Sequence, residues 1–123
     1  MMDLPMQSTV DLRLGDCLEL MRDIPSLYAQ EELGENAIAY IKFFTPDSNW
    51  MWFAIEGCWI TWDNKELSLT ENPIDGMDVL FFGFIRGEFD ELTYFSLREL
   101  KRIGAACDLS WQPRTIAKCR RDP

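Results

Sequence analysis

Carboxylates are the residues of this chain whose number and spacing could support acid–base chemistry. The sequence holds 21 Asp and Glu residues, and several stand close together, namely Glu31/Glu32, Asp75/Asp78 and Glu88/Asp90/Glu91. A catalytic pair needs two carboxyls with different pKa values in one cleft, and adjacency in so acidic a chain does not select such a pair. The absence of His excludes the triads, metal sites and proton shuttles that depend on it. We predict no catalytic residues and no enzymatic activity; an enzyme that works without His is the alternative.

The cysteines and the glycines give no sign of a cofactor. Successive cysteines stand 41, 49 and 12 positions apart without a C-x-x-C pair, at Cys17, Cys58, Cys107 and Cys119. This spacing indicates neither a zinc site nor a redox motif. The common phosphate-binding, dinucleotide-binding and hydrolase glycine patterns are also missing. We predict no cofactor and no metal, and we expect reduced thiols, with Cys58 buried and inert.

The net charge of −9 is unevenly distributed along the chain. Residues 1–97 contain 18 acidic and 5 basic residues, whereas residues 98–123 contain 3 acidic and 7 basic residues. An acidic body repels phosphate backbones, so we predict a protein partner with a basic surface. A solvated surface that only keeps the protein soluble is the alternative. Direct contact with nucleic acid is expected only through the basic tail, at Arg114, Lys118, Arg120 and Arg121.

The acids are densest over residues 63–91, and we predict partner-binding residues there. Two tryptophans at the start of this stretch are candidate apolar anchors, because aromatic side chains often carry the binding energy of an interface. Packing in the core is the alternative for them. The predicted set is Asp63, Glu66, Glu71, Asp75, Asp78, Glu88, Asp90, Glu91, Trp59 and Trp62.

Apolar, β-branched and aromatic runs predict the strands that must position these residues. The strands are expected near residues 37–45, 50–62, 79–86 and 92–95, with a further one at 106–111, and helices at 16–24 and 97–103. Gly57, within the second strand, predicts a β-bulge or a bend, with the strand continuing at Cys58. The pattern predicts a single α+β domain with an antiparallel sheet of four to six strands and two short helices.

The strongest local signal surrounds the helix expected at residues 97–103. Ser96 and Glu99 have the spacing of a capping box, and Phe95 and Leu100 have that of a hydrophobic staple. Gly104 is the expected C-terminal cap. Pro113 is expected to end the last strand, and the tail AKCRRDP at residues 117–123 is expected to fray. The division predicted is an N-terminal segment at 1–26, a domain at 27–116 and a basic C-terminal tail at 117–123.

Both faces of the two longest strands are apolar, as Trp52 and Phe53 illustrate. An antiparallel sheet usually exposes one face to water, and two short helices are expected to cover only one. We expect the N-terminal segment and loop 66–78 to cover the second face. The alternative is an apolar interface for a target or for self-association, as in a homodimer.

Three stretches within residues 27–116 carry a resemblance: LYAQEE at Leu27–Glu32, YIKFFTPDSNWMWFAIE at Tyr40–Glu56 and LFFGFIRGEFDELTYFSLREL at Leu80–Leu100. They resemble the small bacterial and phage family known as domain of unknown function 2958. That family occurs on plasmids, prophages and conjugative elements, sometimes beside or joined to antirestriction proteins. The resemblance implies a mobile-element protein without known catalytic residues. The chain departs from the family after Ile103 and at Gly57–Asp78, where we expect any function of its own.

Residues 10–25, VDLRLGDCLELMRDIP, resemble the opening strand and helix of bacterial DNA amino-methyltransferases. Those enzymes continue into a D-P-P-Y motif, whereas Ser26, Leu27 and Tyr28 follow here, and the chain has no F-x-G-x-G cofactor loop. The resemblance therefore implies no methyltransferase activity. A gene fusion that donated the segment is one explanation, and chance similarity is the other.

The family resemblance, the acidic body and the missing enzyme motifs together favour a non-enzymatic interaction protein of a phage or mobile element. We expect an inhibitor of a host defence complex, either anti-CRISPR or antirestriction. An accessory module for conjugation or replication proteins, which contacts nucleic acid through the basic tail, is the alternative. The start of the sequence has no leader pattern, and no apolar run approaches ~20 residues, so we predict a cytoplasmic protein of a bacterial host without membrane contact.

Overall fold

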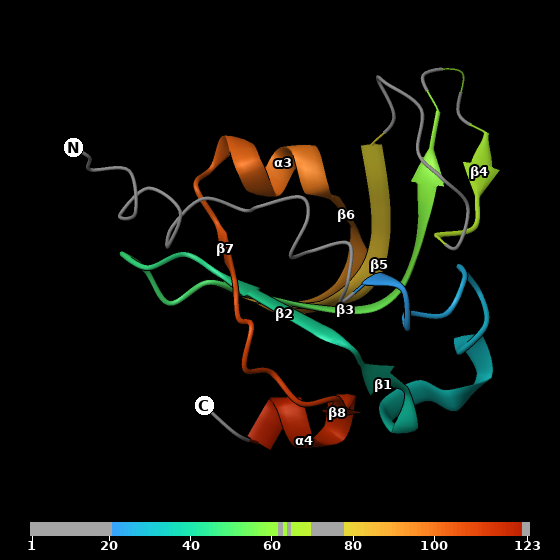
Figure 1. Ribbon diagram of the computed structural model, residues 1–123. Coiled ribbons are helices and arrows are strands. Elements are labelled where there is room, and N and C mark those ends of the chain that lie inside the picture. Colours follow the sequence, from blue (N-terminus) through green and yellow to red (C-terminus); the bar gives the residue numbers. More distant parts are fainter. Residues whose placement is uncertain (1–20, 62, 64, 70–77, 122–123) are drawn as a thin grey trace.

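Strand β3 (Met51–Ile60) is the longest strand and lies in the middle of the sheet. The computed structural model describes residues 21–61, 63, 65–69 and 78–121, and Figure 1 labels its elements. The other strands are β1 (Ile38–Ala39), β2 (Ile41–Phe44), β4 (Glu66–Leu67), β5 (Asp78–Arg86), β6 (Asp90–Ser96), β7 (Ala106–Cys107) and β8 (Arg114–Thr115). The helices are the 3₁₀-helix η1 (Glu31–Asn36) and the α-helices α3 (Leu97–Arg102) and α4 (Ile116–Arg121).

Six strands form one antiparallel sheet in the order β6-β5-β3-β2-β7, with β4 also paired to β3. Strand β3 is longer than either partner on its second edge, where β2 pairs with residues 51–54 and β4 with Trp59 and Ile60. Strands β1 and β8 form a separate antiparallel ribbon. The predicted α+β class and the antiparallel sheet are confirmed.

Between β2 and β4, the edge of β3 is completed by the turn that precedes η1. The backbone N–H of Gly57 donates to the Pro25 carbonyl at 2.9 Å. The side-chain amide of Gln30 donates to the carbonyls of Ile38 and Ile55, both at 3.0 Å, and its oxygen accepts from the Ile38 N–H at 2.7 Å. Gln30 therefore bridges β1 and β3, which accounts for its burial.

The bulge in β3 lies before the glycine at which the sequence predicts it. The register against β5 shifts between Ala54 and Glu56, whereas Gly57 keeps its partner Phe81. A bulge sets two residues of one strand against one of its partner and interrupts the alternation of side chains. Ile55 and Glu56 accordingly line the same cavity. The prediction of a bulge is right in kind and wrong in position.

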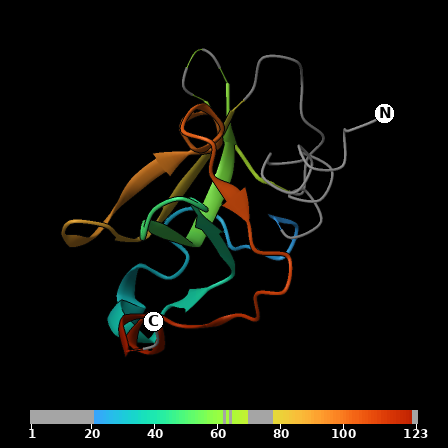
Figure 2. The ribbon, with the colours of Figure 1, turned by 90° about the vertical axis from the view of Figure 1, so that its left-hand side faces the viewer.

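Helices α3 and α4 cover opposite faces of the sheet, as Figures 1 and 2 both show. On the α3 face, Leu97 and Leu100 pack in a cluster with Phe43 and Phe81, whose ring centroids are 5.4 Å apart. The same cluster includes three residues from outside the helix and the main strands, namely Met21, Ile24 and Leu69. The described parts of the N-terminal segment and of the loop after β4 thus contribute to this face, whereas the second face was expected.

Helix α4 covers the second face, and this corrects, as far as Arg121, the prediction that the tail at residues 117–123 frays. Ile116 and Cys119 are buried in a cluster with Phe53 and Phe84. Thr115 caps the helix, because its hydroxyl accepts the N–H of Lys118 at 3.2 Å. The helices expected at 16–24 and 97–103 contribute Met21 and Leu97 to the α3 face, which agrees with the expectation that they cover one face only. The segment expected to cover the second face was wrong, because α4 covers it. Where the structure describes it, this stretch of the second face is therefore not an open apolar interface.

Both ends of helix α3 are capped in the way that the sequence predicts. The Ser96 hydroxyl accepts the Glu99 N–H at 3.1 Å, and the Glu99 carboxylate accepts the Ser96 N–H at 3.0 Å. At the other end Gly104 has φ +76°, and the Ala105 N–H donates to the Leu100 carbonyl at 2.9 Å. These bonds form a capping box and a Schellman motif, so both predicted caps are confirmed.

Three other expected elements differ from the structure or lie outside it. The strand expected at 106–111 ends at Cys107, because the Asp108 carboxylate accepts the Ser110 N–H at 3.0 Å and closes a turn. Most of the helix expected at 16–24 lies outside the described residues. Loop 66–78 begins as β4, and its residues 70–77 lie outside the described part.

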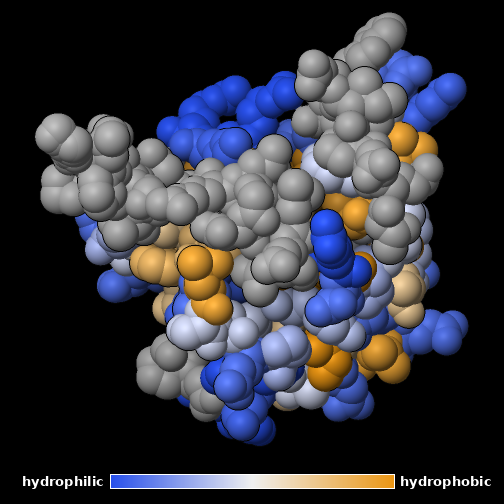
Figure 3. Space-filling view, in the orientation of Figure 1, coloured by the Kyte–Doolittle hydropathy of each residue, from blue (hydrophilic) through white to orange (hydrophobic). Residues whose placement is uncertain are grey.

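Within the residues that the structure describes, no helix is both long enough and apolar enough to cross a membrane. On the coloured part of the face shown in Figure 3, hydrophobic residues appear only in small separate groups among hydrophilic ones. The larger apolar side chains of the sheet are instead inside the two clusters, where Phe43, Phe81 and Phe84 are fully buried.

Candidate partner-binding surface

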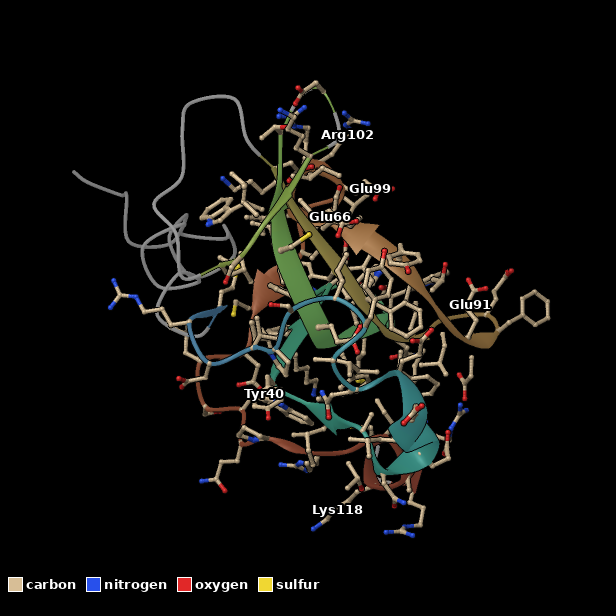
Figure 4. The ribbon with its side chains drawn as sticks, turned by 90° about the vertical axis from the view of Figure 1, so that its right-hand side faces the viewer. Tyr40, Glu66, Glu91, Glu99, Arg102 and Lys118 are labelled. Atoms are coloured by element: carbon tan, nitrogen blue, oxygen red, sulfur yellow. The ribbon has the colours of Figure 1, made fainter. Side chains whose placement is uncertain are left out.

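The predicted acidic residues that the structure describes lie at two ends of the sheet and not on one surface. Asp63 and Glu66 lie near the end where β5 begins, since Ile60 pairs with both Glu66 and Asp78. Glu88 lies in the turn of the β5–β6 hairpin, and Glu91 lies in β6, where it pairs with Ile85 near the other end of β5. The nine residues of β5 place the two ends about 26 Å apart, at ~3.3 Å per residue. In Figure 4, Glu66 and Glu91 mark the two positions.

Asp78 has a structural role at the first of these ends. Its carboxylate accepts the N–H of Arg98 at 3.0 Å and that of Val79 at 2.8 Å. Arg98 is in the first turn of α3, where backbone N–H groups lack partners inside the helix. Asp78 therefore fixes α3 to the start of β5, and its side chain is only partly exposed.

Trp59 is not an accessible anchor, and this prediction is wrong. Only 3% of the residue is exposed, and it packs in the α3-face cluster with Leu69 and Val79. The alternative that the sequence left open, core packing, is the correct one for this residue. Three further members of the predicted set, Glu71, Asp75 and Trp62, lie outside the described residues.

The β5–β6 hairpin presents an aromatic side chain that the sequence reasoning missed. Phe89 is 79% exposed at the tip, and its neighbours Glu88, Asp90 and Glu91 are exposed as well. The base of the turn is fixed, because Trp50 packs so closely over Gly87 that a Cβ there would stand 2.4 Å from the Trp50 ring. The missed signal was an aromatic residue inside a turn, which cannot reach the core.

A cavity of about 180 Å³ opens on the second face, beside the region that α4 covers. Its walls include two aromatic residues of adjacent strands, Phe82 and Tyr94, whose ring centroids are 5.0 Å apart. Tyr28 lines it from the turn before η1. The lining contains two carboxylates, Glu31 and Glu56, and no basic residue. None of these residues was predicted as a site.

Tyr28 is held over this cavity in an unusual backbone conformation. Its φ is +76°, which is rare for a large side chain. The buried Glu56 carboxylate holds the turn, because it accepts the Tyr28 N–H at 2.8 Å and the Gln30 N–H at 2.6 Å. Glu56 is only 3% exposed, so these charge-assisted bonds stabilise an otherwise costly burial. The bulge in β3 thus supplies the group that fixes Tyr28.

The hydroxyl of Tyr28 lies beside the side chains of Glu66 and Tyr94 at the rim of the cavity. It donates to the Glu66 carboxylate at 3.4 Å. The negative charge of Glu66, followed by the neighbouring Tyr94, raises the pKa of Tyr28 above its ordinary value. Glu66, which was predicted to bind a partner, therefore stands at the edge of the cavity, whereas the other exposed acids of the set do not line it.

Cys58 is buried in β3, as expected from the sequence, and burial raises the pKa of its thiol from 9.0 to about 11. At pH 8 the thiolate fraction is then about a hundredfold below that of an unperturbed cysteine. We expect iodoacetamide to label Cys58 at least about a hundredfold more slowly in the folded protein than in urea. Mass spectrometry of the peptide that contains Cys58 measures both rates, and similar rates would contradict the burial of a protonated thiol.

The basic residues of the C-terminal quarter do not form one patch. Arg102 and Lys118 belong to helices on opposite faces of the sheet, and Figure 4 shows them at opposite ends of the molecule. Arg120 is engaged within the chain: its Nε donates to Glu35 at 2.8 Å, and its guanidinium lies 4.4 Å from the Phe84 ring centre. The predicted basic tail is therefore a packed helix with part of its charge already paired.

No model of a protein family matches this chain, and the comparisons with curated proteins and with solved structures find no match either. The resemblances noted in residues 27–116 and 10–25 therefore stay predictions. Function has to be argued from the exposed hairpin, the cavity and the distribution of charge.

Proposed function

We propose that this protein is a non-enzymatic binding protein that uses the β5–β6 hairpin to engage a protein with a basic surface. The observation that carries the proposal is the composition of the hairpin tip. Phe89 projects into solvent between Glu88, Asp90 and Glu91. An aromatic side chain among charges of one sign combines an apolar anchor with electrostatic steering.

The resemblance to a mobile-element family favours one class of partner, a bacterial defence complex whose nucleic-acid groove is basic. In such a groove the carboxylates of the hairpin would take the place of phosphates. The acidic charge of residues 1–97 supports this proposal, since long-range attraction accelerates the encounter of oppositely charged surfaces. The alternative, nucleic-acid contact through the C-terminal residues, has less support because Arg120 is paired with Glu35.

Charge reversal at the hairpin tests the proposal. We expect Glu88→Lys with Glu91→Lys to slow association with a purified CRISPR effector complex or restriction enzyme by tens of fold at low ionic strength. High salt should reduce the difference, because it screens exposed charges. Biolayer interferometry at two salt concentrations measures the association rate constants.

A matched control carries the same change of net charge at exposed acids away from the hairpin, Asp23→Lys with Glu32→Lys. It should slow association by less than about threefold, since steering depends most on charges near the contact. Phe89→Ala, in contrast, should raise the dissociation rate constant, because it removes the apolar anchor of the formed complex. Equal effects of the two double reversals would show that net charge, and not the hairpin, determines binding, and would overturn the proposal.

A further inference from the structure

The cavity beside Tyr28 has the chemistry of a site for a cationic side chain. Three aromatic residues line it, and aromatic ring faces attract cations within about 6 Å of the ring centre. Glu31 and Glu56 add two carboxylates, and Glu66 stands at the rim through its contact with the Tyr28 hydroxyl. No described basic residue lines the cavity, so these charges are not neutralised from within its lining.

The neighbouring contact on the same face shows how this chain holds such a group. The Arg120 guanidinium lies 4.4 Å from the Phe84 ring centre, and its Nε donates to Glu35. Phe82 stands two residues from Phe84 along β5, so both side chains point to the same face of the sheet. The cavity therefore repeats, with Phe82, Tyr94 and two acids, the combination of ring and carboxylate that binds Arg120.

We propose that the cavity lined by Tyr28, Phe82 and Tyr94 binds the guanidinium group of one arginine side chain from a basic partner protein. The volume is sufficient, because about 180 Å³ is the space of about six water molecules at ~30 Å³ each, and the six bonded heavy atoms of a guanidinium with two methylene groups need less. A guanidinium suits the site better than an ammonium, since its plane stacks on rings while its N–H groups donate to carboxylates.

The site is also built before any ligand arrives. Tyr28 is fixed at φ +76° by the buried Glu56, whose two backbone hydrogen bonds leave carboxylate lone pairs for a further donor. A preformed site loses less conformational entropy on binding than one that must be assembled. This observation gives the strained backbone of Tyr28 a function, and it does so independently of the hairpin.

The inference deepens the proposed function, because the arginine would belong to the same basic partner. Its test needs no partner. N-acetyl-arginine methylamide is titrated into the ¹⁵N-labelled full chain, with the citrulline analogue as a neutral probe of nearly the same shape and the lysine analogue as a second cation. We expect saturable shifts of the amide signals of residues 28–31, Glu56, Phe82 and Tyr94 with the arginine probe only, and weaker binding at high salt.

Two variants show whether the cavity is responsible. Tyr94→Leu removes a half-exposed ring and should weaken arginine binding at least fivefold, whereas Phe89→Leu makes a comparable aromatic-to-leucine change at the hairpin and should leave it unchanged. Circular dichroism confirms that both variants are folded. Equal shifts with citrulline, undiminished binding in Tyr94→Leu, binding of the lysine probe as tight as that of arginine, or no saturable shift would each overturn the inference. None of these results bears on the hairpin, whose charge-reversal test uses a protein partner and rate constants.

Discussion

Replacing Gly83 by alanine should lower the free energy of unfolding by about 3 kcal/mol or more, the upper part of the range for forcing atoms into a packed interior. Gly83 lies in β5 between Ala54 of β3 and Thr93 of β6, in the middle of the sheet. A Cβ at this position would stand 2.0 Å from the Phe53 carbonyl oxygen. Because that neighbour is backbone, relief requires β3 and β5 to separate. Urea titrations followed by tryptophan fluorescence measure the loss.

The matched control is Gly57→Ala, the same substitution in the adjacent strand. There the added Cβ would meet side-chain atoms only, Phe81 at 3.1 Å and Leu69 at 3.2 Å. Side chains adjust more cheaply than paired backbone, so we expect a cost below about 1 kcal/mol for this variant. If Gly83→Ala unfolded at the same urea concentration as Gly57→Ala, the close approach of β3 and β5 at Gly83 would be disproved.

Replacing Ile116 by alanine should lower the free energy of unfolding by about 3 kcal/mol, within the range of ~2–5 kcal/mol for a buried Ile→Ala change. Ile116 is fully buried in the second core cluster with Phe53 and Phe84. Lys118→Ala lies in the same helix at an exposed position and should change stability by less than about 0.5 kcal/mol. Thermal and urea unfolding of the two variants measure the difference.

Removal of all residues after Pro113 should lower the stability of the fold further than the replacement of Ile116 by alanine. It deletes β8 and α4 together and exposes the apolar side chains of β3 and β5 that they cover. We expect the shortened chain to lose cooperative unfolding and to bind a hydrophobic dye. A shortened chain that unfolds like the full one would contradict the packing of α4 and restore the frayed tail that the sequence suggested.

The elements predicted best are those whose signals are local. The ends of α3 follow from side chains within a few residues of each other, Ser96 with Glu99 and Gly104 with the last turn. Helix α4 buries only Ile116 and Cys119, and its stability comes from packing against residues of distant strands. Periodicity alone therefore could not distinguish it from a tail.

The candidate sites also differ in how far local sequence signals could predict them. The exposure of Glu88 follows from its place in a turn and that of Glu91 from its place at the start of the edge strand β6, and the predicted strand at 79–86 already separated both from Asp78. The cavity depends on a bulge in β3 and on contacts between Tyr28 and Glu56, which are 28 positions apart. Trp59 could not be assigned because both faces of its strand are apolar, so its type was compatible with either a core or an interface.

The side-chain amide of Gln30 has a consequence for the solubility of this protein. Strand β3 is flanked by β2 and β4 with a gap between them, and an unpaired stretch of strand edge is a template on which another chain can add itself. Gln30 and the Pro25 carbonyl occupy the backbone groups of Ile55 and Gly57 in that gap. A glutamine side chain thus performs the task of a missing strand and protects the middle of the sheet from intermolecular β-pairing.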